Sequence, residues 1–549
     1  MGKWKILLLA GIVLLAFFLR FYKVTEIPPS LNWDEVSIGY NAYSILKTGR
    51  DEWGVFLPIH FKAYGEFKLP VQIYASIPGI AIFGLNELGV RITPVIYGTL
   101  TVLFLFFLTR ALFKKDEIGF MAAFFLGVSP WHIQLTRASF ESSFAAFWIV
   151  LGLWFLVKGF DKHKWIIFSI IPLAVSIYTY NSARIFTPFF LLAIVFIYRQ
   201  TFLKFRKEII ISILIFIAAM LPLVPSLFSG ERTARFKLVS VTDDPGLIPR
   251  INESRGKSSL PWPLPRLIHN KVTYVSFYVT QNYLAHFNPD FLFISGAPHK
   301  QHHVQGVGEL YWVQAPFLFL GLYFLFKKRH PFKWLVILGI LIAFIPVSIT
   351  NDSIPHALRT LIAVPFYAIL TGFGIYETYL FLKNKKKLIN AVLLVVFILF
   401  VINFVIYLNN LFNLYSKNYS RDWQYGYEQA VEYIEEHSGE YDEIVFSRTY
   451  GEPHMFTLFF LNYDPVKYQT NPNLIRYESF DWVWVLKFDK FYFPDLGDKG
   501  TTFTDIVARN PDKKLLFIGK PGDFPKEWQR LNKISFLNNN PAFDIVEKK

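Results

Sequence analysis

Long apolar runs separated by short polar stretches recur along most of the 549-residue chain. A helix needs about 20 apolar residues to cross the hydrocarbon core of a bilayer, which is roughly 30 Å thick. Runs of this kind predict eleven membrane-spanning helices, over residues 5–22, 88–110, 118–136, 140–158, 165–181, 185–200, 209–228, 310–326, 332–350, 357–382 and 388–411. The pattern therefore predicts a polytopic α-helical membrane protein.

Three longer polar segments remain, at residues 23–87, 229–309 and 412–549. We expect the first two to be large loops of a transmembrane domain that covers 1–411. The third segment predicts a small separate α/β domain, because helical and strand periodicities alternate along it. The expected elements are helices over 422–437 and 453–462, and strands over 443–447, 482–486, 514–518 and 543–546.

Basic residues gather in the short stretches between the runs, which indicates the cytoplasmic side of a membrane protein. With Lys3 and Lys5 in the cytoplasm, alternating spans place every cluster there as well: 110–115, 158–164, 199–207, 327–333 and 383–387. We expect a multi-pass protein of the plasma membrane with a cytoplasmic N-terminus and three extracytoplasmic segments. No small-residue cleavage site follows the first run, which predicts an uncleaved span.

The composition of the chain supports a membrane protein and restricts its partners. The chain is 53% hydrophobic and 18% charged, which is too apolar for a soluble protein of this size. The net charge of +15 is explained by the basic clusters between spans, so a nucleic-acid partner is not expected. There is no cysteine, so a metal would need His, Asp or Glu ligands.

Two adjacent carboxylates, Asp34 and Glu35, follow the first span. A helix is expected from Glu35 to a stop at Gly49, amphipathic and lying along the membrane surface. The carboxylates could serve only to satisfy the N–H groups at its start. They could also do chemistry, because a positioned carboxylate accepts a proton from a hydroxyl or amine.

Lys68 lies further along the same segment, in the sequence Lys-Leu-Pro of residues 68–70. Such a lysine can extend to lipid headgroups, or its ammonium can bind a lipid-linked phosphate. Glu87 and Arg91 are four residues apart at the start of the second span, so a local ion pair is expected.

Three other arginines, Arg137, Arg184 and Arg359, stand at predicted outer boundaries of spans. Arg137 could pair with Glu141, and the others could anchor the protein at headgroup level. Charge near a membrane is also often functional, so each is a candidate contact for a phosphate or sugar.

The second long segment contains His299, His302 and His303, followed by Glu309. Imidazole and carboxylate groups could hold a divalent cation there. The alternative is that His302, His303 and Glu309 bind sugar hydroxyls.

The order Trp33-Asp34-Glu35, Gly39-Tyr40-Asn41-Ala42, Gly65-Glu-Phe-Lys68-Leu-Pro70, Phe83-Gly84, Glu87 and Arg91 resembles the first outer loop of the GT-C membrane glycosyltransferases. The likeness is to the protein O-mannosyltransferase-like enzymes (glycosyltransferase family 39) and the aminoarabinose transferases of lipid A. It is specific over residues 30–95. It implies an enzyme that takes a sugar from a polyprenyl-phosphate carrier at the outer face of the membrane and transfers it with inversion.

The resemblance also implies roles for individual residues. Asp34, with Glu35 beside it, matches the catalytic or acceptor-orienting aspartate, and Lys68 matches the lysine that faces the carrier phosphate. Phe67 departs from the pattern, because a glutamate is common there and Glu66 stands one position earlier. The full set of candidates is Asp34 and Glu35 as catalytic residues, Lys68, Arg91, Arg137 and Arg359 on the donor phosphate, and Tyr40, Glu66, Arg184, His302, His303 and Glu309 lining the substrate.

A rival interpretation is a transporter or flippase of lipid-linked sugars. Transporters place charges and interrupted helices near the midplane in paired halves, and this pattern is not found in the sequence. A third possibility is an inactive member of the family whose C-terminal domain binds a partner. The acceptor is left open between a protein hydroxyl, a glycolipid and an envelope polymer, and so are the sugar and the oligomeric state.

Overall fold

The computed structural model describes residues 2–224, 239–479, 482–496 and 501–548. The chain divides into two compact units. One, here called the helical unit, comprises Met1–Tyr22, Pro94–Thr136 and Phe140–Asn410. The other, called the sheet unit, comprises Lys23–Thr93, Arg137–Ser139 and Leu411–Lys549.

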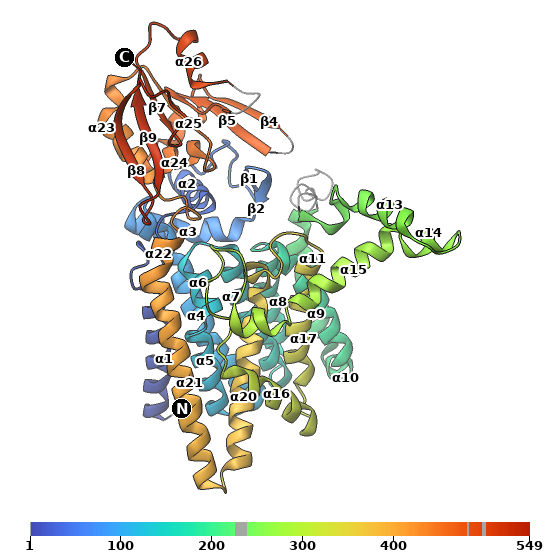
Figure 1. Ribbon diagram of the computed structural model, residues 1–549. Coiled ribbons are helices and arrows are strands. Elements are labelled where there is room, and N and C mark those ends of the chain that lie inside the picture. Colours follow the sequence, from blue (N-terminus) through green and yellow to red (C-terminus); the bar gives the residue numbers. More distant parts are fainter. Residues whose placement is uncertain (1, 225–238, 480–481, 497–500, 549) are drawn as a thin grey trace. The chain divides into compact units, whose positions relative to one another are not determined.

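The helical unit is built almost entirely of helices (Figure 1). They are α1 (Lys3–Phe21), most of α4 (Glu87–Phe113), α5 (Asp116–Gly127), α6 (Pro130–Arg137), α7 (Glu141–Asp161), α8 (Lys164–Ile177), α9 (Asn181–Ile197), α10 (Arg199–Phe202), α11 (Arg206–Met220), α13 (Leu247–Lys257), α14 (Leu264–Ile268), α15 (Lys271–Ala285), α16 (Gln314–Lys327), α17 (Lys333–Ala343), α18 (Ile345–Ser348), α19 (Ala357–Thr360), α20 (Val364–Leu382) and α21 (Lys386–Asn409).

Each of the eleven predicted spans contains a helix, although 225–228 at the end of the seventh lies outside the described residues. Among the described residues, five helices are long and apolar enough to cross a membrane, or six if the bent pair α5 and α6 is one span. Several shorter apolar helices, including α8, α9 and α16, cover other predicted spans. The helical fold is thus confirmed, and the number of crossings stays a prediction.

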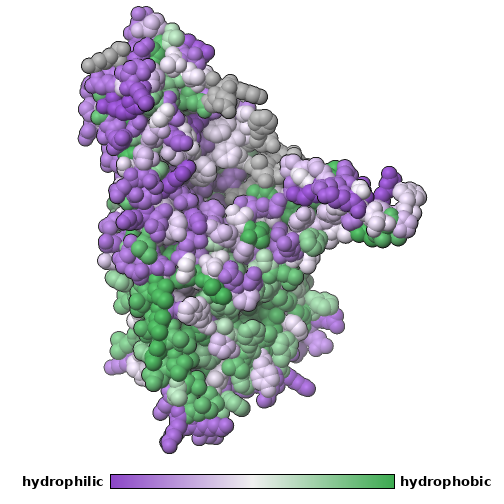
Figure 2. Space-filling model, viewed as in Figure 1, coloured by the Kyte–Doolittle hydropathy of each residue, from purple (hydrophilic) through white to green (hydrophobic). Residues whose placement is uncertain are grey.

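Many apolar side chains of the helical unit are exposed. Only 11% of the most apolar 18-residue stretch that includes α21 is buried, and Leu394 and Phe397 are among the exposed residues of this helix. Figure 2 shows such hydrophobic surface gathered over the helices. An exposed apolar surface of this kind is typical of helices that face lipid.

The sheet unit joins the first polar segment to the C-terminal tail. Its helices are α2 (Trp33–Thr48), α3 (Pro70–Phe83), the start of α4, α22 (Ser416–Tyr419), α23 (Tyr427–His437), α24 (Pro453–Phe460), α25 (Pro465–Gln469) and α26 (Phe503–Arg509). Its strands are β1 (Phe61–Ala63), β2 (Glu66–Lys68), β3 (Glu443–Phe446), β4 (Ile475–Ser479), β5 (Trp482–Phe488), β6 (Phe491–Tyr492), β7 (Leu515–Gly519), β8 (Gln529–Ser535) and β9 (Pro541–Glu547).

Strand β3 lies at the centre of a seven-stranded sheet of order β4-β5-β6-β3-β7-β9-β8. It pairs in parallel with β6 and β7, and the other pairs in the sheet are antiparallel. Strands β1 and β2 form a separate antiparallel hairpin in which Phe61 pairs with Lys68. The predicted strands over 443–447, 482–486, 514–518 and 543–546 correspond to β3, β5, β7 and β9.

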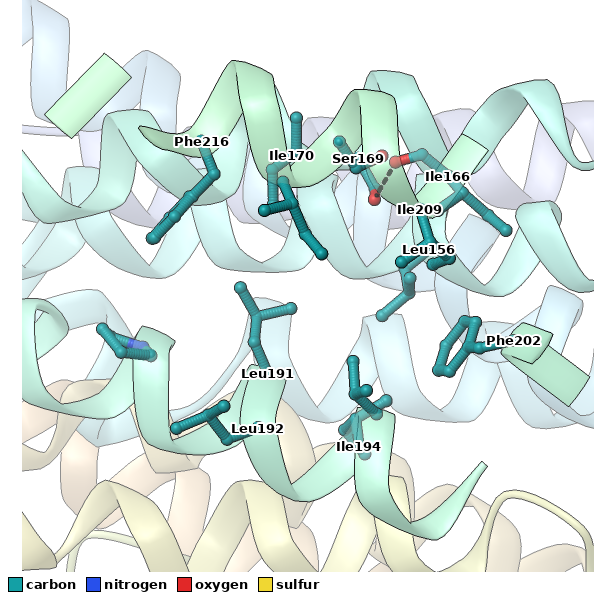
Figure 3. A pocket seen from close by; sticks show the side chains of 14 residues that line it. Leu156, Ile166, Ser169, Ile170, Leu191, Leu192, Ile194, Phe202, Ile209 and Phe216 are labelled. Atoms are coloured by element: carbon teal, nitrogen blue, oxygen red, sulfur yellow. Dashed lines mark hydrogen bonds between the residues drawn. The ribbon is translucent and has the colours of Figure 1, made fainter. Parts of the chain in front are cut away.

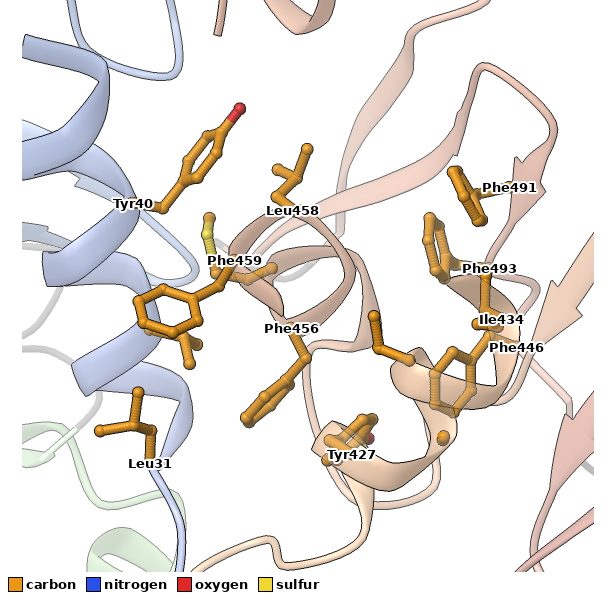
Figure 4. Close-up of a cluster of buried hydrophobic side chains, with 14 of the residues drawn as sticks. Leu31, Tyr40, Tyr427, Ile434, Phe446, Phe456, Leu458, Phe459, Phe491 and Phe493 are labelled. Carbon is orange, nitrogen blue, oxygen red and sulfur yellow. The ribbon is translucent and has the colours of Figure 1, made fainter. Parts of the chain in front are cut away.

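Helix α2 is largely buried inside the sheet unit, so the expectation of an amphipathic helix with one exposed face is wrong, while its position along the membrane surface stays a prediction. Its apolar side chains belong to one core cluster with α24 and the sheet (Figure 4). At Gly39, a Cβ atom would come within 2.6 Å of the Phe459 ring and 2.7 Å of Val90. Glycine therefore permits this close packing, and the predicted stop at Gly49 is confirmed by its left-handed φ of 69°.

Candidate functional site

The candidate site lies at the N-terminus of α2, which is held by a specific set of hydrogen bonds. Asn32 is the N-cap, and its side-chain oxygen accepts a hydrogen bond from the Glu35 backbone N–H at 3.0 Å. In return, the Glu35 carboxylate accepts one from the Asn32 N–H at 3.3 Å. This capping box satisfies two N–H groups that the helix cannot pair internally. The predicted structural role of Glu35 is therefore present.

Glu35 also forms a fully buried ion pair with Arg91 from α4. The Arg91 Nε and Nη2 groups each lie 3.0 Å from a Glu35 carboxylate oxygen, and both side chains have 0% exposure. The Ser139 N–H donates a further bond to Glu35 at 3.0 Å. Because the Glu35 carboxylate has so many partners inside the protein, its role is structural. Of the two predicted catalytic residues, Asp34 is therefore the remaining candidate.

Arg91 uses all of its five N–H groups inside the protein. Besides Glu35, it donates to the carbonyl oxygens of Val24, Pro28 and Ser30. The expected pair with Glu87 is wrong, because Arg91 is bound to Glu35. No donor of Arg91 is left for a phosphate, so its predicted phosphate-binding role is not supported either.

Asp34 is directed away from this buried pair, and its side chain is 37% exposed. Its carboxylate accepts a hydrogen bond from the Lys68 ammonium at the end of β2, and Lys68 is only 3% exposed. Glu66 Oε1 lies 3.5 Å from the same ammonium. The structure thus brings together three predicted site residues: an accessible carboxylate, a buried ammonium and a second carboxylate.

Aromatic side chains pack beside Asp34 and Lys68. Tyr64, at the tip of the β1–β2 hairpin, donates from its hydroxyl to the Trp33 carbonyl at 2.7 Å. Its ring stacks on Trp482 with 5.9 Å between centroids, and Lys68 Nζ lies 5.8 Å from the Tyr64 centroid. The Val483 N–H bonds to the Tyr64 carbonyl at 2.9 Å, so the hairpin is fixed to β5.

Such a group can carry out proton transfer and charge compensation. A partly exposed carboxylate can accept a proton from a hydroxyl nucleophile. A buried ammonium can stabilise negative charge that develops on a departing oxygen, more strongly than it would in water.

Two other predicted residues of the sheet unit have internal contacts. Tyr40 is fully buried and donates to the Tyr463 carbonyl at 3.1 Å, so it belongs to the core and does not line a site. Arg137 is also fully buried, and its guanidinium donates to the carbonyl oxygens of Ile27 and Lys23.

The histidine group lies in the helical unit. His303 Nδ1 is 3.0 Å from Glu309 Oε1, and both side chains are buried. Burial alone would lower the pKa of His303, but the Glu309 carboxylate raises it above its usual value. The rings of His299 and His302 stack at 3.7 Å, and His356, which the sequence did not single out, stacks on His302 at 5.0 Å. Among the described residues, no three His, Asp or Glu side chains are grouped to hold a metal ion.

Arg359 and Arg184 are in the helical unit as well. Arg359 donates to Thr350 Oγ1 at 2.8 Å and to Asp352 at 2.7 Å. Arg184 donates to the Ile177 carbonyl and to Asn181, each at 3.3 Å.

Sequence reasoning missed an apolar pocket of about 400 Å³ in the helical unit (Figure 3). Side chains of α8, α9 and α11 line it, among them Ile170, Leu191 and Phe216. Its lining is almost wholly apolar. No sequence pattern predicts this pocket, because residues that face lipid and residues that face a pocket are equally apolar.

Comparisons with known proteins show what part of the chain is similar to. Residues 70–225 match the family model of the dolichyl-phosphate-mannose-protein mannosyltransferases. The dolichyl-phosphooligosaccharide-protein glycotransferases 2 of Pyrococcus furiosus and Pyrococcus horikoshii are 30% identical over 127 and 134 residues. These stretches are 22% and 23% of this chain and 16% and 17% of the relatives, so the matched part of the chain spans less than a fifth of the length of these curated relatives.

Two solved structures are similar in fold. ArnT from Cupriavidus metallidurans, bound to undecaprenyl phosphate, has a TM-score of 0.53 and 12% identity, over 100% of this chain and 98% of ArnT. The oligosaccharyltransferase AglB from Archaeoglobus fulgidus, in complex with an inhibitory peptide and a dolichol-phosphate, has a TM-score of 0.50 and 12% identity, over 83% of this chain and 64% of AglB. The chain therefore shares the fold of these two membrane proteins, and the resemblance to the GT-C group found in the sequence is confirmed at the level of the fold.

The structural role of Glu35 predicts a large loss of stability in Glu35→Ala. This change leaves the Arg91 guanidinium buried without a counter-charge, which costs about 3–5 kcal/mol. The control is Glu26→Ala, because Glu26 has a 65% exposed side chain paired with Lys23, and an exposed pair contributes about 1 kcal/mol or less. Thermal unfolding of the purified protein measures both. Equal melting temperatures for the two variants would contradict the assignment.

Proposed function

We propose that this protein is a membrane glycosyltransferase that transfers a sugar from a polyprenyl-phosphate-linked donor to an acceptor at the outer face of the membrane, with inversion. The observation that carries the proposal is the contact between the partly exposed Asp34 carboxylate and the buried Lys68 ammonium. This contact places a possible proton acceptor, Asp34, next to a positive charge, Lys68, in a chain of GT-C fold.

In the proposed reaction, Asp34 orients the acceptor hydroxyl and takes its proton. The acceptor oxygen forms a bond to the anomeric carbon while the bond from that carbon to the phosphate oxygen breaks. The polyprenyl phosphate leaves with the bonding electrons, and Lys68 stabilises its negative charge. A single displacement of this kind inverts the configuration at the anomeric carbon.

The comparisons support a lipid-linked donor. The ArnT and AglB structures contain undecaprenyl phosphate and dolichol-phosphate, and the matching family model is named for dolichyl-phosphate-mannose. The apolar pocket between α8, α9 and α11 offers a surface of the right chemistry for a prenyl chain. A nucleotide is not needed, because the phosphate leaving group arrives on the lipid.

The remaining donor contacts are also proposals. Arg137 and Arg359 stay candidates for the donor phosphate, and Arg184, His302, His303 and Glu309 for the substrate. A divalent cation could assist a phosphate leaving group in principle. However, the pairing of His303 with Glu309 uses two of the four predicted ligands, so we assign no cation to that group.

The proposed topology has eleven spans, a cytoplasmic N-terminus and an extracytoplasmic site in the plasma membrane. The basic clusters between the spans support this orientation. The alternative function, a flippase of lipid-linked sugars, would move the donor without forming a glycosidic bond. A proteoliposome assay that detects the new bond separates the two.

Asp34→Asn tests the proton acceptor. We expect transfer of labelled sugar from a polyprenyl-phosphate donor in proteoliposomes to fall about 100-fold or more, because the amide cannot take the proton. The control is Asp512→Asn, an exposed aspartate in a turn before β7. Full transfer by Asp34→Asn would refute the assigned role.

Lys68→Met tests charge stabilisation on the phosphate. We expect kcat/KM for the donor to fall about 100-fold or more, with an unchanged melting temperature, because the partly exposed Asp34 can be hydrated instead. Lys62→Met is the matched control, since Lys62 lies in the same hairpin and is 34% exposed. If both variants use the donor equally well, Lys68 has only an anchoring role.

A further inference from the structure

The sheet unit contains a second candidate site, an open pocket of about 520 Å³. It lies at the end of β3, where the loop 447–452 leaves the central strand of the sheet. Because β3 is parallel to both of its neighbours, this loop is at the carboxyl end of parallel strands. In α/β folds, ligands commonly bind at that edge.

The pocket is tied to the start of α2. The Trp33 N–H donates to Gln424 Oε1 at 2.8 Å, and Gln424 Nε2 donates to the Tyr450 carbonyl at 2.6 Å. Gly451 has a φ of +133°, and a Cβ atom there would lie 2.6 Å from the Trp33 ring. Trp33 therefore forms a wall of the pocket, and the next residue in the chain is Asp34.

Indole rings form much of the lining. The centroids of Trp482 and Trp33 are 6.3 Å apart, and those of Trp482 and Trp484 are 5.8 Å apart. All three tryptophans are only partly buried, so they keep accessible surface. The Arg448 guanidinium lies 4.7 Å from the centroid of Trp484.

Two charged groups add polarity to this aromatic lining. Glu452 is 1% exposed, and its Oε1 accepts from Trp482 Nε1 at 2.7 Å, while its Oε2 lies 3.3 Å from His454 Nδ1. Arg448 donates to the Tyr477 hydroxyl at 2.6 Å and the Val485 carbonyl at 3.1 Å. The opposite charges of Glu452 and Arg448 offset each other, so the pocket does not select for an anion.

We propose that this pocket binds a neutral sugar ring of the acceptor. This inference rests on the proposed function, and it makes a saccharide-bearing molecule the acceptor class. Pyranose rings have apolar C–H faces and polar edges, which suits aromatic walls with a few fixed polar groups. Because Trp33 adjoins Asp34 in the chain and Tyr64 connects Trp482 to Lys68, a sugar held here lies beside the proposed catalytic pair.

A peptide acceptor is less suited to the pocket. A peptide in an extended conformation is usually held by its backbone N–H and C=O groups at a sheet edge. Arg448 and Glu452, which line this pocket, are instead hydrogen-bonded to neighbouring groups of the protein, and the open faces are aromatic.

The test is binding of fluorescent disaccharides of glucose, mannose, galactose and N-acetylglucosamine to the full-length protein in nanodiscs, without donor. We expect at least one to bind, and Trp484→Ala to weaken that binding about ten-fold, because one aromatic face is lost. Trp484→Phe should retain most of the binding. Trp262→Ala is the control, since Trp262 is 76% exposed and lies in the helical unit.

No binding of any of these sugars at millimolar concentration would overturn the proposal. Equal affinities of the wild type and Trp484→Ala would do so as well. Displacement of the bound sugar by an unglycosylated hydroxyl-containing peptide, with loss of peptide binding in Trp484→Ala, would assign the pocket to peptides instead.

A kinetic measurement separates this proposal from the proposed function. In transfer assays, Trp484→Ala should raise the KM for the saccharide acceptor about ten-fold and leave the KM for the donor unchanged. Asp34→Asn should bind the disaccharide like the wild type. If the wild type binds sugars through Trp484 but transfers none, the proposed function fails and the saccharide pocket stands.

Discussion

The buried ion pair between Glu35 and Arg91 is the interaction on which the rest of the site depends. It is fully buried, and the guanidinium also binds three backbone carbonyls of the segment before α2. Arg91 of α4 thus holds in place both the first turn of α2 and the segment that precedes it. Because consecutive helical residues point in different directions, fixing Glu35 inside directs Asp34 outward. The chemistry we propose for Asp34 follows from this division of roles between neighbouring carboxylates.

The sheet unit completes the arrangement with residues from distant parts of the sequence. Lys68 arrives on the β1–β2 hairpin, and that hairpin is held to β5 of the C-terminal tail through Tyr64. The tail also supplies α24, against which α2 packs at Gly39. Asp34, Lys68 and the tryptophan-lined pocket therefore belong to one compact unit. The C-terminal segment therefore contributes directly to the site that we propose for the transfer reaction.

The sequence predicted the helical part well and the tertiary contacts poorly, for physical reasons. In a membrane each span must satisfy its own backbone, so its apolar run is visible locally. Arg91 was expected to pair with Glu87 by helical spacing, but its partner Glu35 is 56 residues away. The burial of α2 was missed because part of the surface that covers it comes from the distant C-terminal tail. Strands β4, β6 and β8 were missed because they are short or largely polar. Asp34 and Lys68 were candidates from their residue types and from the family resemblance, but nothing in their spacing predicted that the two side chains lie together.

The stereochemistry of the product tests the central claim most directly. A polyprenyl-phosphate sugar labelled with a carbon isotope at the anomeric position would be incubated with the reconstituted protein and a cell-envelope extract. Nuclear magnetic resonance of the labelled product then reports the new bond and its configuration. Our account predicts a new glycosidic bond with the opposite anomeric configuration to the donor. A product with retained configuration, or movement of the donor across the membrane without a new bond, would contradict it.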